Sequence, residues 1–165
     1  MVDVVLMTAA RAGDAALFER MHAAARETQD RLERRYLTMA LLAFGEPALA
    51  ERGMAVLLDP AFDVRESWTA LRYANGWSPG RRAAHDFILR NFEALAGRVD
   101  RDAPGHWPSY SAGLCRAADE AELAAFWRDR VTRYAGAERE LAEALESIRS
   151  CEQLREHAGS PRFDG

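Results

Sequence analysis

The feature that most constrains this chain is a helical spacing of apolar residues that runs from one end to the other. Apolar side chains recur three and four positions apart through most of the sequence, and nothing alternates long enough to predict a strand. Turn-forming residues interrupt the pattern, as at Gly13 and in the segments 59–63 and 75–80. The pattern therefore predicts an all-α fold.

Residues favoured at helix N-termini mark where these helices should begin. Asp119 stands three residues before Glu122, which is the spacing of a capping box. Pro47 is expected in the first turn of its helix, where its missing N–H costs least. Acidic N-caps are also predicted at Asp14, Asp30 and Asp63.

The second half of the chain has its own pattern. Residues 100–113 form the longest irregular segment, and a short helix is expected after them near Leu114. A long helix is expected from Ala137 to about Ala158. We therefore predict a single helical domain over residues 1–158, followed by a frayed tail over 159–165.

The expected helices form pairs that begin at regular intervals. Pairs start near Asp14, Glu46, Arg81 and Asp119, which are 32, 35 and 38 residues apart. Units of this size stack in helical-repeat proteins because none buries its apolar face alone. The spacing favours an irregular α-solenoid of antiparallel helix pairs, similar to HEAT or armadillo superhelices. A plain helical bundle is the alternative.

Charge and composition exclude several classes of partner. The net charge is −4, whereas binding to nucleic acid needs a basic face. All 22 basic residues are arginine, and with the many alanines this favours a bacterial source. No apolar run approaches the ~20 residues that span a bilayer. With no signal peptide visible, a cytoplasmic location is expected. Cys115 and Cys151 match no metal or disulfide spacing and are expected to be buried, reduced thiols.

The segment 78–97 tests whether the chain carries a catalytic centre. His85 adjoins Asp86, but neighbours on a helix point about 100° apart and cannot form a dyad. Asp86 can instead pair with Arg90 one turn later. A core-facing stripe is formed by Ala84, Phe87, Ile88, Phe92 and Leu95. The segment is therefore interpreted as a packing helix.

The other candidate residues give no catalytic or metal-binding pattern either. The four histidines form no H-x-x-x-H, and no phosphate loop or nucleophile motif is present. No metal ligand, cofactor-binding residue or catalytic residue is predicted. Trp77 and Trp107 lie in turn-rich connections, where each is either a lid over a helix pair or an exposed contact residue, with the lid favoured.

Four segments carry a family resemblance that covers nearly the whole chain. They read EPAL at 46–49, RRAAHDFILRNFEAL at 81–95, AELAAFWRDRV at 121–131 and LAEALESIRSCEQLR at 141–155. In this order, they resemble the C-terminal helical domain of aminopeptidase N-type zinc metallopeptidases (peptidase family M1). His85 stands where that family usually has Trp, and Trp127 where a second Phe is common.

The resemblance implies a domain that shapes access to chemistry performed elsewhere. The family's H-E-x-x-H zinc helix is absent from this sequence, so zinc would belong to a catalytic domain of the same polypeptide. The chain alone is then not an enzyme. It would form a wall that limits and orients peptide substrate. Charge alone makes Arg65, Arg72 and Arg90 candidates for contacting the peptide, although arginines on helices more often serve solubility.

Two other functions remain open from the sequence. One is a stand-alone HEAT-like scaffold that binds a protein partner. The other is an independent enzyme, which would require peptide hydrolysis or metal uptake by this chain. The chain begins directly with a helical pattern at Val2, which favours a fragment of a longer polypeptide and hence the access-wall interpretation.

Overall fold

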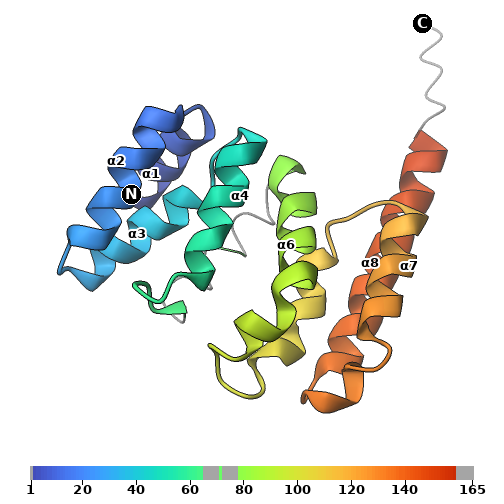
Figure 1. The fold of residues 1–165 in the computed structure, drawn as a ribbon. Helices are drawn as coiled ribbons and strands as arrows, with labels where there is room; N and C mark the ends of the chain where they lie inside the picture. The colour runs from blue at the N-terminus through green and yellow to red at the C-terminus, as the bar shows by residue number, and fades with distance from the viewer. Residues whose placement is uncertain (1, 65–70, 72–77, 159–165) are drawn as a thin grey trace, which may run out of the picture. The chain divides into compact units, whose positions relative to one another are not determined.

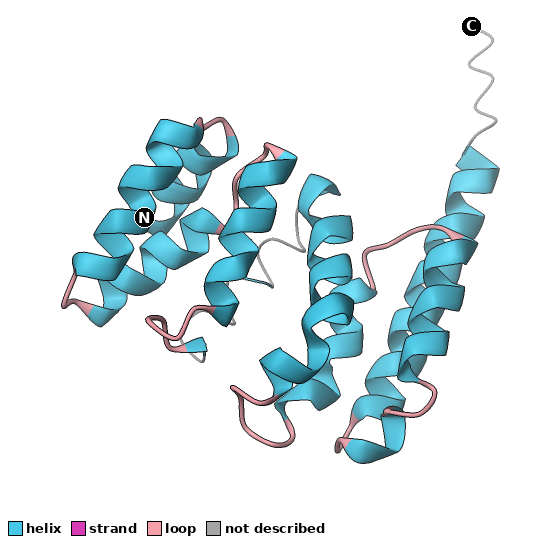
Figure 2. Cartoon of the chain, in the orientation of Figure 1, coloured by secondary structure: helices cyan, strands magenta, loops and turns pink. Residues whose placement is uncertain are grey.

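The computed structural model describes residues 2–64, 71 and 78–158, and Figure 2 shows helices and turns throughout this part. None of these residues lies in a strand, so the predicted all-α class is confirmed. The chain divides into two compact units, residues 1–100 and 101–165. The single domain over 1–158 stays a prediction, and the tail 159–165 lies outside the described residues.

The first unit contains five α-helices and one short 3₁₀ helix among its described residues. They are α1 (Val2–Arg11), α2 (Ala15–Glu27), α3 (Arg31–Leu41), α4 (Pro47–Ala55), the 3₁₀ helix η1 (Val56–Leu58) and α6 (Ser78–Ala96). Two predicted caps are confirmed: Asp14 accepts from the Leu17 N–H at 2.8 Å, and Asp30 accepts from the Leu32 N–H at 2.8 Å. Asp63 precedes the undescribed segment, so its predicted cap lies at the edge of what the structure describes.

The helices of the first unit lie in two layers. Figure 1 shows α2, α4 and α6 as neighbouring rods. Behind them α3 contacts α1, α2 and α4, and α4 contacts α6. Every residue of the predicted α6 stripe is buried. The α6 backbone departs from helical geometry at Asn91, whose side-chain amide donates to the Phe87 carbonyl at 2.9 Å. The stacking of pairs into a solenoid stays a prediction.

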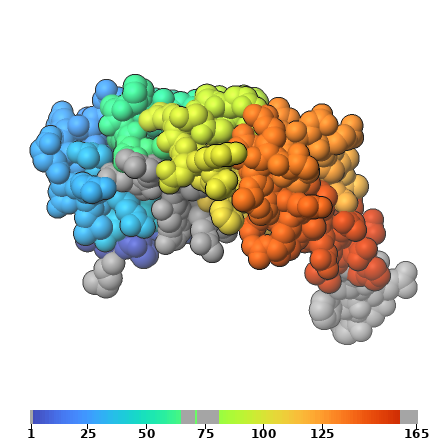
Figure 3. Space-filling model, turned by 90° about the horizontal axis from the view of Figure 1, so that it is seen from below, coloured from blue at the N-terminus to red at the C-terminus, as the bar shows by residue number. Residues whose placement is uncertain are grey.

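The second unit is built on one long helix. Its described elements are the 3₁₀ helix η2 (Ala103–Ser111), α7 (Ala117–Trp127), the 3₁₀ helix η3 (Val131–Arg133) and α8 (Ala137–Ala158). Both η2 and α7 pack on α8, which begins and ends where the sequence predicts. In Figure 3 the orange-to-red surface of this unit is formed mainly by α7 and α8.

The segment predicted to be irregular is helical instead. Residues 103–111 form η2, although the segment holds two prolines and a glycine. Pro104 lies in the first turn of η2, where a backbone N–H has no partner within the helix and its absence costs least. Trp107 lies in η2 and is 1% exposed, so the buried interpretation of this tryptophan is confirmed. Trp77 lies outside the described residues.

The predicted capping box at Asp119 is wrong. The helix α7 begins two residues earlier, at Ala117, and its N-cap is Arg116, which makes no side-chain cap. Asp119 lies in the first turn and is buried. Its carboxylate accepts from the Arg116 guanidinium at 2.7 and 3.1 Å. Asp119 therefore fixes the position of Arg116, which precedes the helix. The negative charge of Asp119 also interacts favourably with the positive N-terminal end of the helix dipole.

The prediction of two reduced thiols is also wrong. Cys115 and Cys151 form a disulfide, with their Cα atoms 5.1 Å apart. The bond joins the connector before α7 to the last turns of α8. Sequence spacing could not reveal this pairing because it depends on how α8 folds back along the connector.

Candidate functional site

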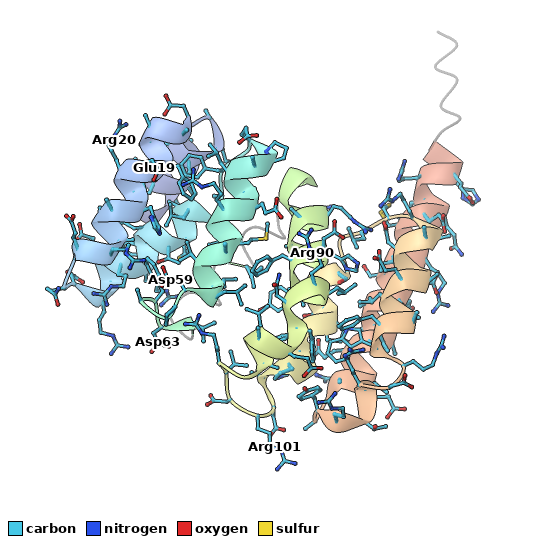
Figure 4. All side chains as sticks on the ribbon, viewed as in Figure 1. Glu19, Arg20, Asp59, Asp63, Arg90 and Arg101 are labelled. Carbon is cyan, nitrogen blue, oxygen red and sulfur yellow. A yellow bond between two sulfur atoms is a disulfide. The ribbon has the colours of Figure 1, made fainter. Side chains whose placement is uncertain are left out.

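Ion pairs link the outer faces of α2, α4 and α6. Arg52 on α4 contacts Glu19 on α2 at 2.6 Å, and Arg90 on α6 contacts Glu51 on α4 at 3.3 Å. We call these two contacts the inter-helix ion pairs. Figure 4 labels Glu19 and Arg90, which lie on this row of helices. All four side chains are about half exposed, so each pair adds at most ~1 kcal/mol.

The predicted pairing of Asp86 with Arg90 is wrong. Asp86 instead contacts Arg82, one turn earlier, at 2.8 Å. Arg90 lies close enough to the neighbouring helix α4 to form its ion pair with Glu51 there. A tertiary contact has therefore replaced a local one.

A pocket of about 230 Å³ lies where α2 meets the end of α4. Its walls contain both charged and aromatic side chains. The lining residues are Phe18, His22, Arg52, Ala55, Val56 and Asp59. The pocket is wholly within the first unit and is large enough for one amino-acid side chain.

Aromatic rings and guanidinium groups are layered around this pocket. The His22 ring stacks between Phe18 and Phe62, with centroid distances of 6.1 and 6.0 Å. The Arg52 guanidinium lies 4.5 Å from the Phe18 centroid. Arg26 lies 6.0 Å from the Phe62 centroid. Such cation–π contacts contribute ~0.5–1 kcal/mol at exposed positions and fix the orientation of the rings.

Asp59 is held in its charged form at the edge of the pocket. Its carboxylate accepts the Ala61 N–H at 2.8 Å and pairs with the Arg26 guanidinium. The Ala61 hydrogen bond, with the nearby positive charge of Arg26, lowers the pKa of Asp59 below its usual 3.8. Arg98, after α6, donates to the carbonyls of Asp59 and Phe62 at 2.9 and 2.8 Å, which pins the turn.

Replacing Asp59 by Asn should destabilise the chain by about 1 kcal/mol at pH 7, because the Arg26 pair is lost. The folded-state pKa lies below 3.8, so this stabilisation is present above pH 3.8 and is lost as the pH falls through the folded pKa. Urea unfolding of both proteins between pH 7 and pH 2.5 measures the difference. An Asp59→Asn penalty that stayed constant down to pH 2.5 would contradict this assignment.

The pocket is suited to recognition. Its charged groups are already paired with groups of opposite sign, and the Phe18 ring in its wall is almost fully buried. A charged group of a ligand can exchange one of these paired contacts for another.

Of the three contact residues predicted from the sequence, one lies in the part of the chain that the structure describes. Arg90 is exposed on α6 and paired with Glu51. Arg65 and Arg72 lie outside the described residues. The residues that line the pocket were not identified from the sequence. The sequence does contain one indication of the pocket: Glu19 and Arg52 are 33 residues apart, which is close to the predicted spacing of the helix pairs.

Comparison with known proteins identifies the family of this chain. No helix in the described part of the chain is long and apolar enough to cross a membrane. No curated protein matches the sequence. The family model described as "ERAP1-like C-terminal domain" matches residues 1–150, which is most of the chain and covers α1 to the greater part of α8. The chain therefore belongs to the ERAP1-like C-terminal domain family.

Proposed function

We infer that this chain is the non-catalytic C-terminal domain of a zinc aminopeptidase and forms a wall that limits and orients peptide access to the active site. The observation that carries this proposal is the family match over residues 1–150. The sequence contains no H-E-x-x-H, so zinc and the bond-breaking step would belong to the catalytic domain of the same polypeptide.

Side-chain contacts within each unit support stacked helix pairs as the basis of the wall. In the first unit, contacts join residues 33 positions apart (Glu19 and Arg52) and 39 apart (Glu51 and Arg90). In the second unit, Ser147 donates to the Ala112 carbonyl 35 positions away. These separations are close to the helix-pair spacing of the sequence. Stacked pairs of this kind form extended surfaces suited to long ligands.

The α2–α4 pocket and Arg90 are the positions we propose for contact with the distal part of a peptide. The pocket is lined by the half-buried His22 ring and by Arg52, and Arg90 presents positive charge on α6. Arginine can exchange its Glu51 partner for a peptide carboxylate at little net cost because both states are exposed to water.

The decisive experiment removes this domain from the parent enzyme. The reading frame upstream of codon 1 is sequenced, and the enzyme is assayed with and without residues 1–158. We expect a zinc-binding helix upstream. We also expect deletion to reduce the enzyme's discrimination between long and short peptides while cleavage of single aminoacyl amides persists.

Other outcomes would favour other functions. A stop codon directly before Met1, with a protein partner bound by the isolated chain, would favour the stand-alone scaffold. Unchanged length discrimination after deletion would contradict the access role. A cytoplasmic location stays a proposal, and the Cys115–Cys151 disulfide weighs against it because such bonds persist mainly in oxidising compartments.

A further inference from the structure

The connector that follows η2, residues 112–116, is tied to α8 together with Ala117, the first residue of α7, at four points. Three ties are hydrogen bonds: Ser147 to the Ala112 carbonyl at 2.8 Å, Arg155 to the Cys115 carbonyl at 3.3 Å, and the Ala117 N–H to Glu152 at 2.8 Å. The fourth is the Cys115–Cys151 disulfide. All four act on the segment that leads into the first turn of α7.

One end of the disulfide borders a pocket. Both cysteines are half-buried, and Cys115 lines a pocket of about 300 Å³. The same pocket is lined by Arg116, by Arg155, which donates to the Cys115 carbonyl, and by two glutamates. We therefore expect a small dithiol to reach Cys115 from this pocket without unfolding of the unit.

The packing of α7 on α8 does not depend on the disulfide. Leu123 and Trp127 on α7 are buried, as are Ala144 and Ile148 on α8. Since α7 packs on α8, we infer that these buried side chains form an apolar contact further along the two helices. The unit should therefore stay folded when the disulfide is reduced, and only the connector loses its covalent tie.

We propose that Cys115–Cys151 is a reversible thiol–disulfide exchange site that controls how firmly the connector is held on α8. The co-reactant is a small dithiol. One of its thiolates attacks a cysteine sulfur, the S–S bond breaks, and the other cysteine leaves as a thiolate. The second thiol of the reagent then displaces the first cysteine. The protein gains two electrons and two protons as two thiols, and the reagent becomes a cyclic disulfide.

Reduction should loosen the start of α7. The three remaining ties are hydrogen bonds between exposed groups, each of which competes with water. Without the cross-link between residues 36 positions apart, the connector can open locally while the apolar contact holds. This inference does not depend on the proposed access function.

The test measures hydrogen exchange of the whole chain, oxidised and after treatment with dithiothreitol without denaturant. We expect full reduction under these conditions, shown by two alkylated cysteines in the intact mass. Amides of residues 112–120 should then exchange at least about tenfold faster, while those of residues 140–148 stay unchanged. Removal of dithiothreitol in air should restore both the disulfide and the slow exchange.

The matched control is the double variant Cys115→Ser, Cys151→Ser, which should exchange like the reduced protein and ignore dithiothreitol. Three results would overturn the proposal. They are free thiols that never form the disulfide under oxidation, a disulfide that resists the dithiol until the protein is denatured, and equal exchange of residues 112–120 in both states.

Discussion

Replacing Gly53 with alanine should destabilise the first unit by about 3 kcal/mol. A Cβ atom at this position would lie 2.0 Å from the Leu41 carbonyl oxygen and 2.8 Å from the Leu41 carbonyl carbon. Both are backbone atoms at the end of α3, so no side-chain rotation can relieve the clash and α4 must move away. The better helix propensity of alanine, worth ~1 kcal/mol, recovers only part of this cost.

Gly97→Ala provides the matched control for the Gly53 variant. A Cβ atom there would lie 3.5 Å from the Glu93 oxygen, which is ordinary contact. Urea unfolding followed by circular dichroism should place this control within about 0.5 kcal/mol of the parent chain. Equal unfolding midpoints for the Gly53 and Gly97 variants would show that α4 does not approach α3 as closely as described.

Replacing Trp107 with alanine should destabilise the second unit by about 3–5 kcal/mol. Trp107 is 1% exposed and lies in η2, which packs against α8. Removing its side chain leaves a large cavity, because the neighbouring helices can collapse only partly. Trp107→Phe should cost less, since the phenyl ring fills part of the space.

The neighbouring residue His106 offers a control in the same element. Its side chain is 67% exposed and lies 3.4 Å from a Glu140 oxygen. His106→Ala should change the free energy of unfolding by less than about 0.5 kcal/mol. If the Trp107 and His106 variants unfolded at the same denaturant concentration, Trp107 would be a surface contact residue, which is the alternative that its turn-rich sequence context left open.

Local features of the fold could be predicted from the sequence because they depend on neighbouring residues. The caps at Asp14 and Asp30, the first-turn position of Pro47 and the buried stripe of α6 all follow from spacings of three or four residues. The long helix α8 was also predicted with its correct ends, since few residues interrupt its pattern.

Features that depend on contacts across the fold were missed. Asp86 and Arg90 satisfy a local pairing rule, yet Arg90 binds Glu51 because α4 lies beside α6. Cys115 and Cys151 meet only because α8 folds back along the connector. The helix η2 was missed for another reason, since its prolines and glycine suggest a loop.

The α2–α4 pocket also combines a feature that depends on neighbouring residues with features that depend on contacts across the fold. Phe18 is a buried residue of α2, but its neighbours Arg52 and Asp59 come from positions more than 30 residues later. No short motif joins them. Such a group can be predicted only if it is known which helices lie side by side. The sequence pattern predicts where helices begin and end more reliably than which helices are neighbours.

The inter-helix ion pairs constrain how this sequence can change over evolutionary time. Glu19 with Arg52, and Glu51 with Arg90, join positions about one helix pair apart. Gaining or losing a whole helix pair would keep the remaining helices in register. Inserting two residues between Glu51 and Arg52 would instead turn one of these side chains away from its partner, because side chains are spaced by about 100° around an α-helix. Length variation among descendants of this chain should therefore concentrate in the connecting turns or occur in whole-pair steps.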